Sequence, residues 1–437
     1  MSDEARQILN EAQKQFDHAE VFEQTGETRS VNFESNKLKR VSARQYRGVG
    51  LRIVRDGRIG FASTTDLRDP RRLVEMAAES AQFGEQAKFQ LPGLPDPLPQ
   101  VLTEDPAVPE VSLDDMVTMG REGLEMSLAA NADYLFFADI STKSEAVRLV
   151  NSSGLDLEHS KTDMALEVGV ETVTDDGLLE VSEFKTWGQP LNGLTDITRR
   201  ALDKMQQASV VAPARAEQIP VLFNPKAVGN LLRPILLALS GVLVHKGSSR
   251  LIGKMNERIA DERLDLLDDA TIPFAPQSAP ADNEGVPTRP TLLLEKGVLK
   301  SYLLDLQTAG LLGMQPTGHG YRSYASRPSP SRSNLVVGSG TDSYQDMMAG
   351  LERGLIVDQT LGSGQSNLLA GEFSVNVALG FLVEDGKIKG RVKDCMVAGN
   401  VYDLLNQVEG ISRERQWVGS EHMPAICVRG IKLAAGA

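Results

Sequence analysis

Apolar side chains recur every three or four positions at the start of the chain, and this spacing predicts an amphipathic helix. The positions are Ala5, Ile8, Leu9, Ala12 and Phe16. A similar stripe predicts a helix over about 69–82, and the capping-box pattern of Ser112 and Asp115 opens a helix that reaches about residue 130. A stripe over 197–205 predicts the last helix of the first half.

Between these helices the pattern changes to strict alternation of apolar and polar residues, which is typical of half-buried strands. The alternation runs through 48–61 and again through 136–183. Asp56-Gly57 and Asp176-Gly177 interrupt the two runs. Such pairs predict hairpin turns because glycine supplies the positive φ that the turn needs. We therefore expect antiparallel strands in this half.

A proline-rich segment, Leu91–Glu110, interrupts the first half and holds six of the 21 prolines. Proline removes a backbone donor and fixes φ, so neither a helix nor a central strand is expected there. The segment is predicted to be an extended surface connection within one domain.

The pattern of apolar and polar residues in the second half differs from that in the first, and the boundary between the two patterns falls within 210–220. A helix predicted over about 225–239 is apolar nearly all round, so it must be surrounded by protein. Its apolar residues are Val228, Leu231, Leu232, Ile235, Leu236, Leu237 and Leu239. Short helices are expected at 344–351 and 401–408, with a hairpin turn at Asp385-Gly386. The predicted strands are 291–304, 334–337, 355–360, 372–383, 387–397 and 425–433.

These patterns predict an α+β protein of two domains, which suits a chain of 437 residues. The N-terminal domain, 1–215, has helices packed on a mostly antiparallel sheet. The C-terminal domain, 216–437, is a curved, barrel-like antiparallel sheet around the central apolar helix.

Composition narrows the classes of function. The 46 basic and 59 acidic residues give a net charge of −13, and so acidic a surface repels a phosphate backbone. Two cysteines, Cys395 and Cys427, are too few for a disulfide scaffold or a cysteine-rich zinc site. No apolar run approaches the length of about 18 residues that a membrane helix needs, and the first ten residues lack a secretory signal. We expect a cytoplasmic protein that binds neither nucleic acid nor membrane.

Several common catalytic patterns are missing from the sequence. None of the five histidines lies three to five positions from another, so no helix presents two imidazoles to a metal ion. There is no G-x-S-x-G elbow for a serine nucleophile. Asp268-Asp269 and Asp282-Asn283-Glu284 resemble acid pairs, but their loop surroundings favour solvated turns. Cys427, in an apolar strand pattern, is expected to be a buried structural thiol.

The most unusual local sequence is Thr317–Asn334, which combines small residues with one histidine, two tyrosines and three arginines. A long irregular loop is usually either functional or disordered. This composition suits a flexible tip, or a groove that presents donors to a peptide backbone or a carboxylate. Composition alone favours the surface loop.

Short motifs follow one another in a fixed order along nearly the whole chain. They are 48–52 (GVGLR), 60–66 (GFASTTD), 93–97 (GLPDP), 151–154 (NSSG), 224–227 (NPKA), 246–249 (KGSS), 282–285 (DNEG), 297–304 (GVLKSYLL), 316–320 (PTGHG) and 398–400 (AGN). Each motif is weak alone, but in this order and spacing the sequence resembles the TldD/PmbA family, and specifically its PmbA (TldE) branch.

The resemblance implies a metallopeptidase ancestry without the catalytic residues. In the TldD branch, H-E-x-x-x-H on the central helix and a cysteine near the C-terminus form a zinc site, and the glutamate serves the hydrolytic water. The required positions of that motif fall at Arg233, Pro234 and Ala238 here, and the cysteine position falls near Val418. We therefore expect no catalytic residue, no metal ligand and no cofactor in this chain, with zinc in a TldD-type partner.

The resemblance also implies how such a chain acts. PmbA-branch proteins are expected to pair with a TldD subunit that cleaves unfolded or extended peptides in an enclosed chamber, and a homodimer is possible when the chain is alone. The loop would lie near that chamber, so we expect His319, Arg322 and Arg327 to bind the peptide or the partner. The chain is then a non-catalytic subunit of a heteromeric zinc metallopeptidase. The alternative is a metal-free regulatory or peptide-binding protein, for example a gyrase modulator.

Overall fold

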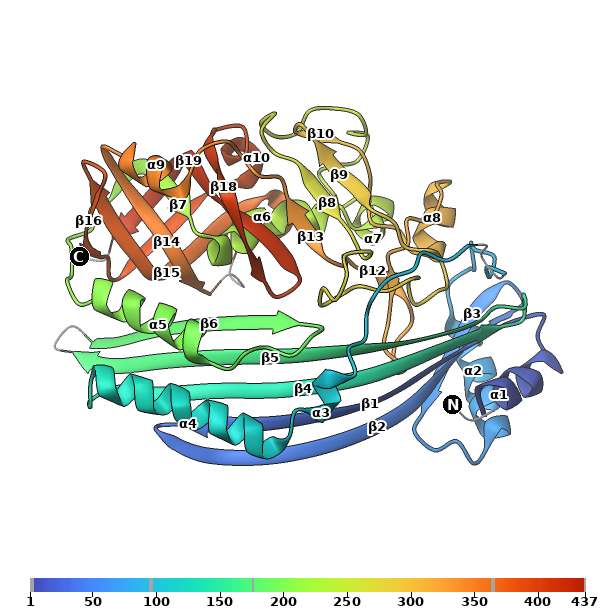
Figure 1. Cartoon of the computed structure of the whole chain (residues 1–437). Coiled ribbons are helices and arrows are strands. Elements are labelled where there is room, and N and C mark those ends of the chain that lie inside the picture. Colours follow the sequence, from blue (N-terminus) through green and yellow to red (C-terminus); the bar gives the residue numbers. More distant parts are fainter. Residues whose placement is uncertain (1–3, 94–96, 175–176, 363–365, 436–437) are drawn as a thin grey trace.

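The computed structural model describes residues 4–93, 97–174, 177–362 and 366–435. A long, curved sheet built from the first half of the chain lies along one side of the molecule, and the strands of the second half form a separate body above it (Figure 1). The prediction of an α+β protein with an antiparallel N-terminal sheet and a barrel-like C-terminal region is confirmed.

Within the described residues, six strands form the N-terminal sheet in the order β3-β2-β1-β4-β5-β6, and every neighbouring pair is antiparallel. The strands are β1 (His18–Glu34), β2 (Lys37–Arg55), β3 (Arg58–Thr64), β4 (Leu135–Asn151), β5 (Asp156–Thr174) and β6 (Gly177–Trp187). Asp56 and Gly57 both have positive φ and turn β2 into β3, as predicted. Asp176 of the second predicted turn lies outside the described residues, and β6 begins at Gly177.

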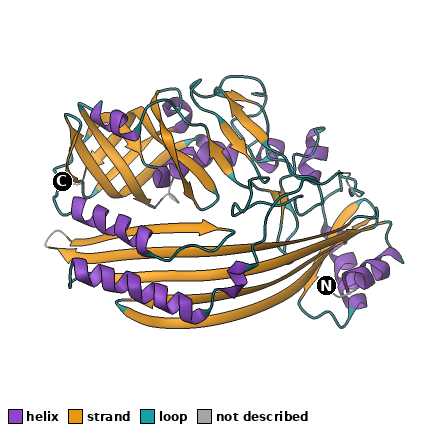
Figure 2. Cartoon of the chain, viewed as in Figure 1, coloured by secondary structure: helices purple, strands orange, loops and turns teal. Residues whose placement is uncertain are grey.

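Helices cover one face of this sheet (Figure 2). They are α1 (Glu4–Gln13), α2 (Pro70–Ser80), α3 (Ala107–Glu110), α4 (Leu113–Ala130) and α5 (Thr195–Gln207), with a 3₁₀ turn at Ala81–Phe83. The predicted capping box at the start of α4 is present, because Ser112 Oγ accepts from the Asp115 N–H and Asp115 accepts from the Ser112 N–H. Val21 of β1 packs with α1 and α2, while Val31, on the same face, packs with α4.

The prediction that no helix occurs in Leu91–Glu110 is wrong at its end. The single turn α3 contains Pro109 and begins directly after Pro106. Both prolines are tolerated because the first backbone N–H groups of a helix have no intrahelical acceptor to bond. Val108 of this turn is fully buried.

The C-terminal half contains a closed barrel of five strands within the described residues. The ring consists of β7 (Glu217–Phe223), β14 (Arg353–Leu361), β15 (Glu372–Glu384), β17 (Cys395–Asn400) and β19 (Glu421–Ala435). Only β7 with β14 is a parallel pair in the ring, and the Asp385-Gly386 turn joins β15 to β16 (Lys387–Arg391) as predicted. Further strands are β8 (Leu266–Asp268), β9 (Thr291–Glu295), β10 (Val298–Leu299), β13 (Leu335–Val337) and β18 (Val408–Val418).

The predicted apolar helix is α6 (Pro225–Ala238), which packs against β14, β18 and β19 and shares one core with them. Ile235 and Leu236 are buried as expected, whereas Leu237 is 37% exposed, so one side of the helix end faces solvent. The shorter helices are α7 (Gly241–His245), α8 (Leu306–Leu312), α9 (Tyr344–Ala349) and α10 (Val401–Leu404), with a 3₁₀ turn at Leu368–Ala370. No described helix is long and apolar enough to cross a membrane.

The loop Thr317–Asn334 belongs to the C-terminal half and contacts the N-terminal sheet. It carries a small hairpin of β11 (Gly320–Tyr321) and β12 (Ser329–Pro330). Its Tyr324 lies directly on β2, where a Cβ added at Gly48 would come within 2.3 Å of the tyrosine ring. A Cβ added at Gly50 would meet the Tyr324 carbonyl oxygen at 2.4 Å. The GVG motif is therefore the place where β2 admits a side chain from the C-terminal half.

Candidate functional site

The positions of the H-E-x-x-x-H motif lie on α6, where Pro234 and Ala238 are buried and Arg233 is exposed. Pro234 stands inside the helix and cannot donate the backbone hydrogen bond of its turn. None of the three side chains carries an imidazole or a carboxylate. The helix is thus retained in the barrel core without the donors that the motif would supply.

The position that corresponds to the zinc-binding cysteine of the TldD branch lies in the β18–β19 hairpin, and this hairpin does meet α6. Val418 is the last residue of β18 and pairs with Glu421 at the start of β19. A Cβ added at Gly229 would lie 2.6 Å from Glu421 Oε2, and Gly229 is one turn before Arg233 on the same helix face. The geometry that brings a helix motif next to a C-terminal residue is therefore present.

Polar groups at this hairpin are already engaged with other side chains. Glu421 pairs with Arg332, and burial raises the pKa of Glu421 although Arg332 opposes the shift. The His422 ring stacks on Trp417 with 4.7 Å between centroids, and burial together with Arg415 lowers the pKa of His422 to about 4. A neutral, stacked imidazole and a paired carboxylate stand where a metal site would need free ligands.

The residues present do not fit a zinc ion. Zinc requires about four nitrogen, sulfur or oxygen donors converging on one point. Across the described ranges, no group of three or more His, Cys, Asp or Glu side chains is placed to hold a metal. Cys395 and Cys427 are buried, and burial raises their pKa values to about 11 and about 12, so both thiols stay protonated at neutral pH.

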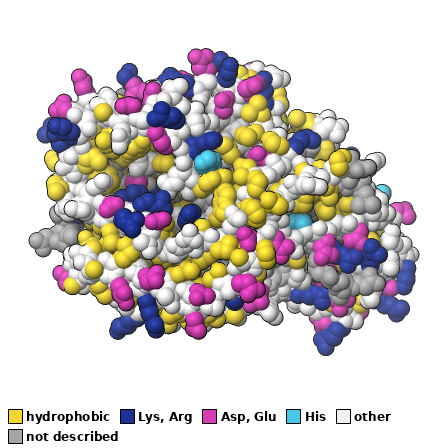
Figure 3. All heavy atoms as spheres, in the orientation of Figure 1, with side chains coloured by type: hydrophobic (Ala, Val, Ile, Leu, Met, Phe, Trp, Pro, Cys, Tyr) yellow, Lys and Arg dark blue, Asp and Glu magenta, His cyan; other side chains and the backbone are white. Residues whose placement is uncertain are grey.

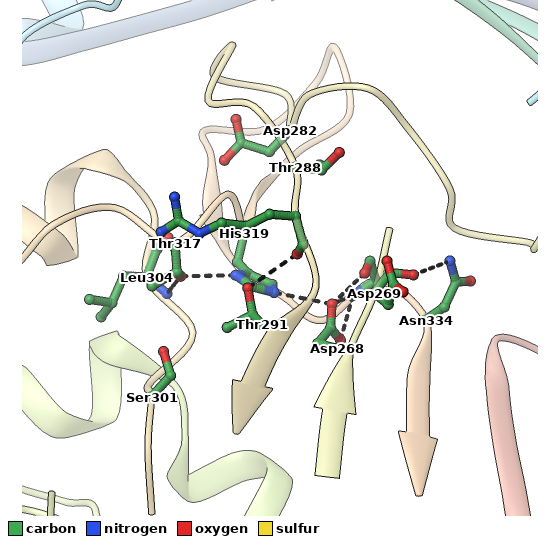
Figure 4. Close-up of polar contacts among 12 residues, drawn as sticks. Asp268, Asp269, Asp282, Thr288, Thr291, Ser301, Leu304, Thr317, His319 and Asn334 are labelled. Atoms are coloured by element: carbon green, nitrogen blue, oxygen red, sulfur yellow. Dashed lines mark hydrogen bonds and ion pairs between the residues drawn. The ribbon is translucent and has the colours of Figure 1, made fainter. Parts of the chain in front are cut away.

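His319 lies in the interior, only 2% exposed (Figure 4). Its Nδ1 is 2.9 Å from Thr317 Oγ1, and its Nε2 is 3.1 Å from Asp268 Oδ1. Asp268, itself 1% exposed, also accepts the backbone N–H of Ser333 at 3.0 Å. His319 therefore ties the start of the loop to β8 and to the loop's far end.

Arg322 is also buried, and its side chain points to the N-terminal sheet. Its Nη2 lies 2.7 Å from Glu20 Oε1, and its guanidinium carbon stands 4.7 Å above the Phe22 ring. Burial lowers the pKa of Arg322 although Glu20 opposes the shift. Arg322 also lines a pocket of about 380 Å³ with His159 and Lys161.

Arg327 is exposed and pairs with Glu85 across a 3.0 Å contact between its Nη1 and the Glu85 Oε1. It lines another pocket, of about 430 Å³. The structure therefore does not gather the three predicted residues into one site. Each has its own acidic partner, and a role for them in holding a peptide or a partner stays a prediction.

Buried charges that the sequence did not single out join the two halves beside this loop. Arg52 of β2 lies 3.0 Å from Glu20 and 2.6 Å from Glu284, and the three side chains are at most 3% exposed. Glu284 also accepts the backbone N–H of Leu306 at 2.7 Å, which opens α8. We call Glu20, Arg52, Glu284 and Arg322 the junction cluster. The sequence could have indicated these buried charges, because Glu20 and Arg52 interrupt runs of apolar residues.

The prediction that the acid pairs are solvated turns is wrong for Asp268, Asp282 and Glu284, all at most 1% exposed. Asp282 accepts backbone N–H groups of Glu284, Val286 and Gly320 within 3.0 Å. Burial and the nearby Glu284 raise the pKa of Asp282 above its usual value. These carboxylates are buried because they satisfy the backbone donors of an irregular loop.

A second set of charged side chains connects the two halves of the molecule near the start of α6. It consists of two buried carboxylates and two partly buried lysines. Lys204 of α5 lies 2.7 Å from Glu183 and 2.8 Å from Asp358, and Lys226 of α6 lies 2.9 Å from Glu183. Burial lowers the pKa of Lys226, whereas for Lys204 burial is outweighed by Asp358 and Glu183, which raise its pKa. Two cations and two carboxylates neutralise one another at this contact.

Two family models match the chain. The model described as PmbA/TldA metallopeptidase C-terminal domain matches residues 216–435, and the model described as PmbA/TldA metallopeptidase domain 1 matches residues 19–81.

Similar proteins span nearly the whole chain. The crystal structure of TldE from Thermococcus kodakarensis is 27% identical, with a TM-score of 0.91 over 99% of this chain and 100% of that one. A metalloprotease of Methanothermobacter thermautotrophicus is 26% identical over 93% of this chain and 90% of its own length. The metalloprotease PmbA of Escherichia coli O157:H7 is 24% identical over 93% of this chain and 89% of its own length. The chain belongs to the TldD/PmbA family of metallopeptidases.

Proposed function

We propose that this chain is a non-catalytic, TldE-like subunit of a cytoplasmic, heteromeric zinc metallopeptidase that degrades or processes unfolded or extended peptides. The observation that carries the proposal is the position of α6 together with the side chains at its motif positions. The helix keeps its place beside the β18–β19 hairpin, while Arg233, Pro234 and Ala238 occupy the motif positions. A TldD-type partner would supply the zinc ligands and the glutamate.

The division of labour follows from the chemistry. Hydrolysis of a peptide bond by a zinc peptidase uses a metal-bound water and a base, and Arg233, Pro234 and Ala238 supply neither a metal ligand nor a carboxylate. This chain would instead enclose and position the substrate. The names of its relatives support a peptide substrate, since PmbA of E. coli is itself described as a metalloprotease.

The test is reconstitution. The purified chain is assayed for cleavage of an unstructured peptide alone and after co-expression with a TldD-type subunit from the same genome. We expect cleavage only in the mixture, loss of cleavage when the glutamate of the partner's motif is changed to Gln, and no loss for Arg233→Ala in this chain. Chelator-sensitive cleavage by the isolated chain would contradict the proposal. A chain that binds peptides but gains no hydrolysis with any partner would be a metal-free regulatory protein instead.

We include in the proposal a contact between the loop Thr317–Asn334 and the peptide or partner. Arg327 offers the cleanest test because it is exposed, whereas His319→Ala and Arg322→Ala also remove buried contacts. Arg327→Ala is expected to weaken assembly or to raise the apparent KM. Arg68→Ala is the matched control, since Arg68 is an exposed arginine paired with Asp66. Equal behaviour of the two variants would remove Arg327 from the proposal.

A further inference from the structure

A groove runs between the N-terminal sheet and the barrel, where β6 and α5 face β18. It contains a pocket of about 620 Å³, and an adjoining pocket of about 450 Å³ shares Arg200, Arg415 and Gln416 with it. In Figure 3, Lys and Arg side chains gather where α5 and β6 face the barrel, next to a hydrophobic area. We call the larger pocket the tryptophan groove, defined by Phe184, Lys185, Arg199, Arg200, Arg415 and Trp417.

Aromatic rings form one wall of the tryptophan groove. The chain has two tryptophans, and they meet here with 5.1 Å between ring centroids and an interplanar angle of 64°. The His422 ring stacks on Trp417, with an angle of 1° between the two ring planes. Phe184 lines the same pocket. Phe184 and Trp417 therefore give the groove an apolar aromatic border beside its charged side chains.

Besides its aromatic side chains, the groove carries a local excess of positive charge. Four cations line the pocket, Lys185, Arg199, Arg200 and Arg415, against one carboxylate, Asp196. Arg199 is paired with Asp196 at 3.2 Å, and Arg200 lies 3.8 Å from Glu183, which Lys204 and Lys226 already contact. The excess stands out on a chain whose net charge is −13.

Two of these cations have no carboxylate of their own. In the described part of the chain, neither Lys185 nor Arg415 has a salt-bridge partner, and Arg415 donates to the backbone carbonyl of Val337 at 3.3 Å. Both side chains are exposed. In contrast, the lysines of the adjoining pocket, Lys204 and Lys226, are partly buried and neutralised by Glu183 and Asp358. The lysine charges of the adjoining pocket are therefore neutralised within the chain, whereas Lys185 and Arg415 of the tryptophan groove can pair with an anion from outside.

We propose that the tryptophan groove binds a carboxylate of an extended peptide, with Arg415 and Lys185 holding the anion and Trp417 covering the neighbouring apolar group. The inference rests on the proposed function, because it names a feature of the peptide that this subunit receives. An arginine binds a carboxylate through two parallel hydrogen bonds, and a lysine adds a point charge. The carboxylate belongs either to the peptide's C-terminus or to an acidic side chain.

The experiment uses the isolated full-length chain, in which Trp417 lines the groove and Trp187 contacts Trp417. A short unstructured peptide with a free C-terminus and no acidic residue is titrated against its C-terminal amide, following intrinsic fluorescence. A second pair compares amidated peptides that differ by one Glu and Gln. The peptide that carries the recognised carboxylate is expected to give a saturable change in tryptophan fluorescence. A difference within the first pair identifies the C-terminal carboxylate as the ligand, and a difference within the second pair identifies the Glu side chain. The apparent Kd should rise with salt.

Variants separate binding from folding. Arg415→Ala and Lys185→Ala are expected to raise the apparent Kd about tenfold each, whereas Arg68→Ala, an exposed arginine elsewhere, should leave it unchanged. Circular dichroism checks that each variant is folded. Equal binding of the two peptides within both pairs, no binding of any peptide, or full binding by Arg415→Ala would overturn the inference. Because no partner subunit is present, this result is independent of whether reconstitution yields a peptidase.

Discussion

The face of α6 beside the β18–β19 hairpin and the junction cluster differ sharply in the chemistry of their side chains. At α6 the motif positions carry Arg233, Pro234 and Ala238, and the helix serves as core. At the junction, residues of the family motifs remain in place and bury charge, with Arg52 between Glu20 and Glu284. Two of the motifs, GVGLR and DNEG, thus supply Arg52 and Glu284 to the contact between the two halves, whereas the H-E-x-x-x-H positions carry no metal donor.

The largest expected effect comes from Arg52→Ala. It leaves Glu20 and Glu284 buried without their main cation, and breaking a buried ion pair from one side costs about 3–5 kcal/mol. The free energy of unfolding in urea measures the loss. Arg68→Ala, which breaks the exposed pair with Asp66, should cost less than about 1 kcal/mol. Similar costs for the two variants would mean that the junction is not held by charge.

The α6 helix should behave as ordinary core. Ile235 is fully buried, so Ile235→Ala is expected to lower the free energy of unfolding by about 2–5 kcal/mol. Leu237→Ala is the matched control on the same helix, since Leu237 is 37% exposed and loses fewer contacts. If Leu237→Ala proved the more costly change, the helix would be seated differently from this description.

A smaller loss is expected for Gly48→Ala. The added Cβ would meet the Tyr324 ring at 2.3 Å, and overpacking of this kind costs about 1–3 kcal/mol. The double variant Gly48→Ala with Tyr324→Ala tests the cause by urea unfolding. The alanine at position 48 should cost little once the ring is gone. A cost that persists in the double variant would point to the β2 backbone rather than to Tyr324.

The smallest effect concerns pH at the hairpin. The folded pKa of His422 is lowered to about 4 from 6.5, so this histidine's contribution to stability is present above pH 6.5 and is lost as the pH falls toward 4. Unfolding free energies measured across that window should fall less steeply for His422→Gln than for the wild type. His245→Gln, at an exposed position, is the control. An unchanged slope in His422→Gln would show that the stacked ring titrates normally.

Much of the fold was predictable because its signals are local. The stripe of α1, the Asp56-Gly57 turn and the Ser112 cap each depend on neighbouring residues alone. The short helix α3 was missed because proline was treated as a helix breaker, although the first turn of a helix tolerates it.

The candidate sites were less predictable because they depend on residues far apart in the sequence. Trp187 and Trp417 meet only when β6 lies beside β18, and nothing next to either tryptophan indicates the other. Arg322 was expected to bind the peptide or the partner, and its carboxylate partner within this chain is Glu20, far from it in the sequence. Composition identifies a group's chemistry but not the partner that folding provides.

Metal content measured together with activity tests the central claim most directly. The chain is purified without a metal-binding tag, loaded with zinc, dialysed and analysed for bound metal, and the same sample is assayed on an unstructured peptide with and without a TldD-type subunit. We predict no tightly held zinc in this chain and cleavage only with the partner, because α6 carries Arg233, Pro234 and Ala238 at the motif positions. One tightly held zinc per chain, with cleavage by the chain alone, would contradict the account.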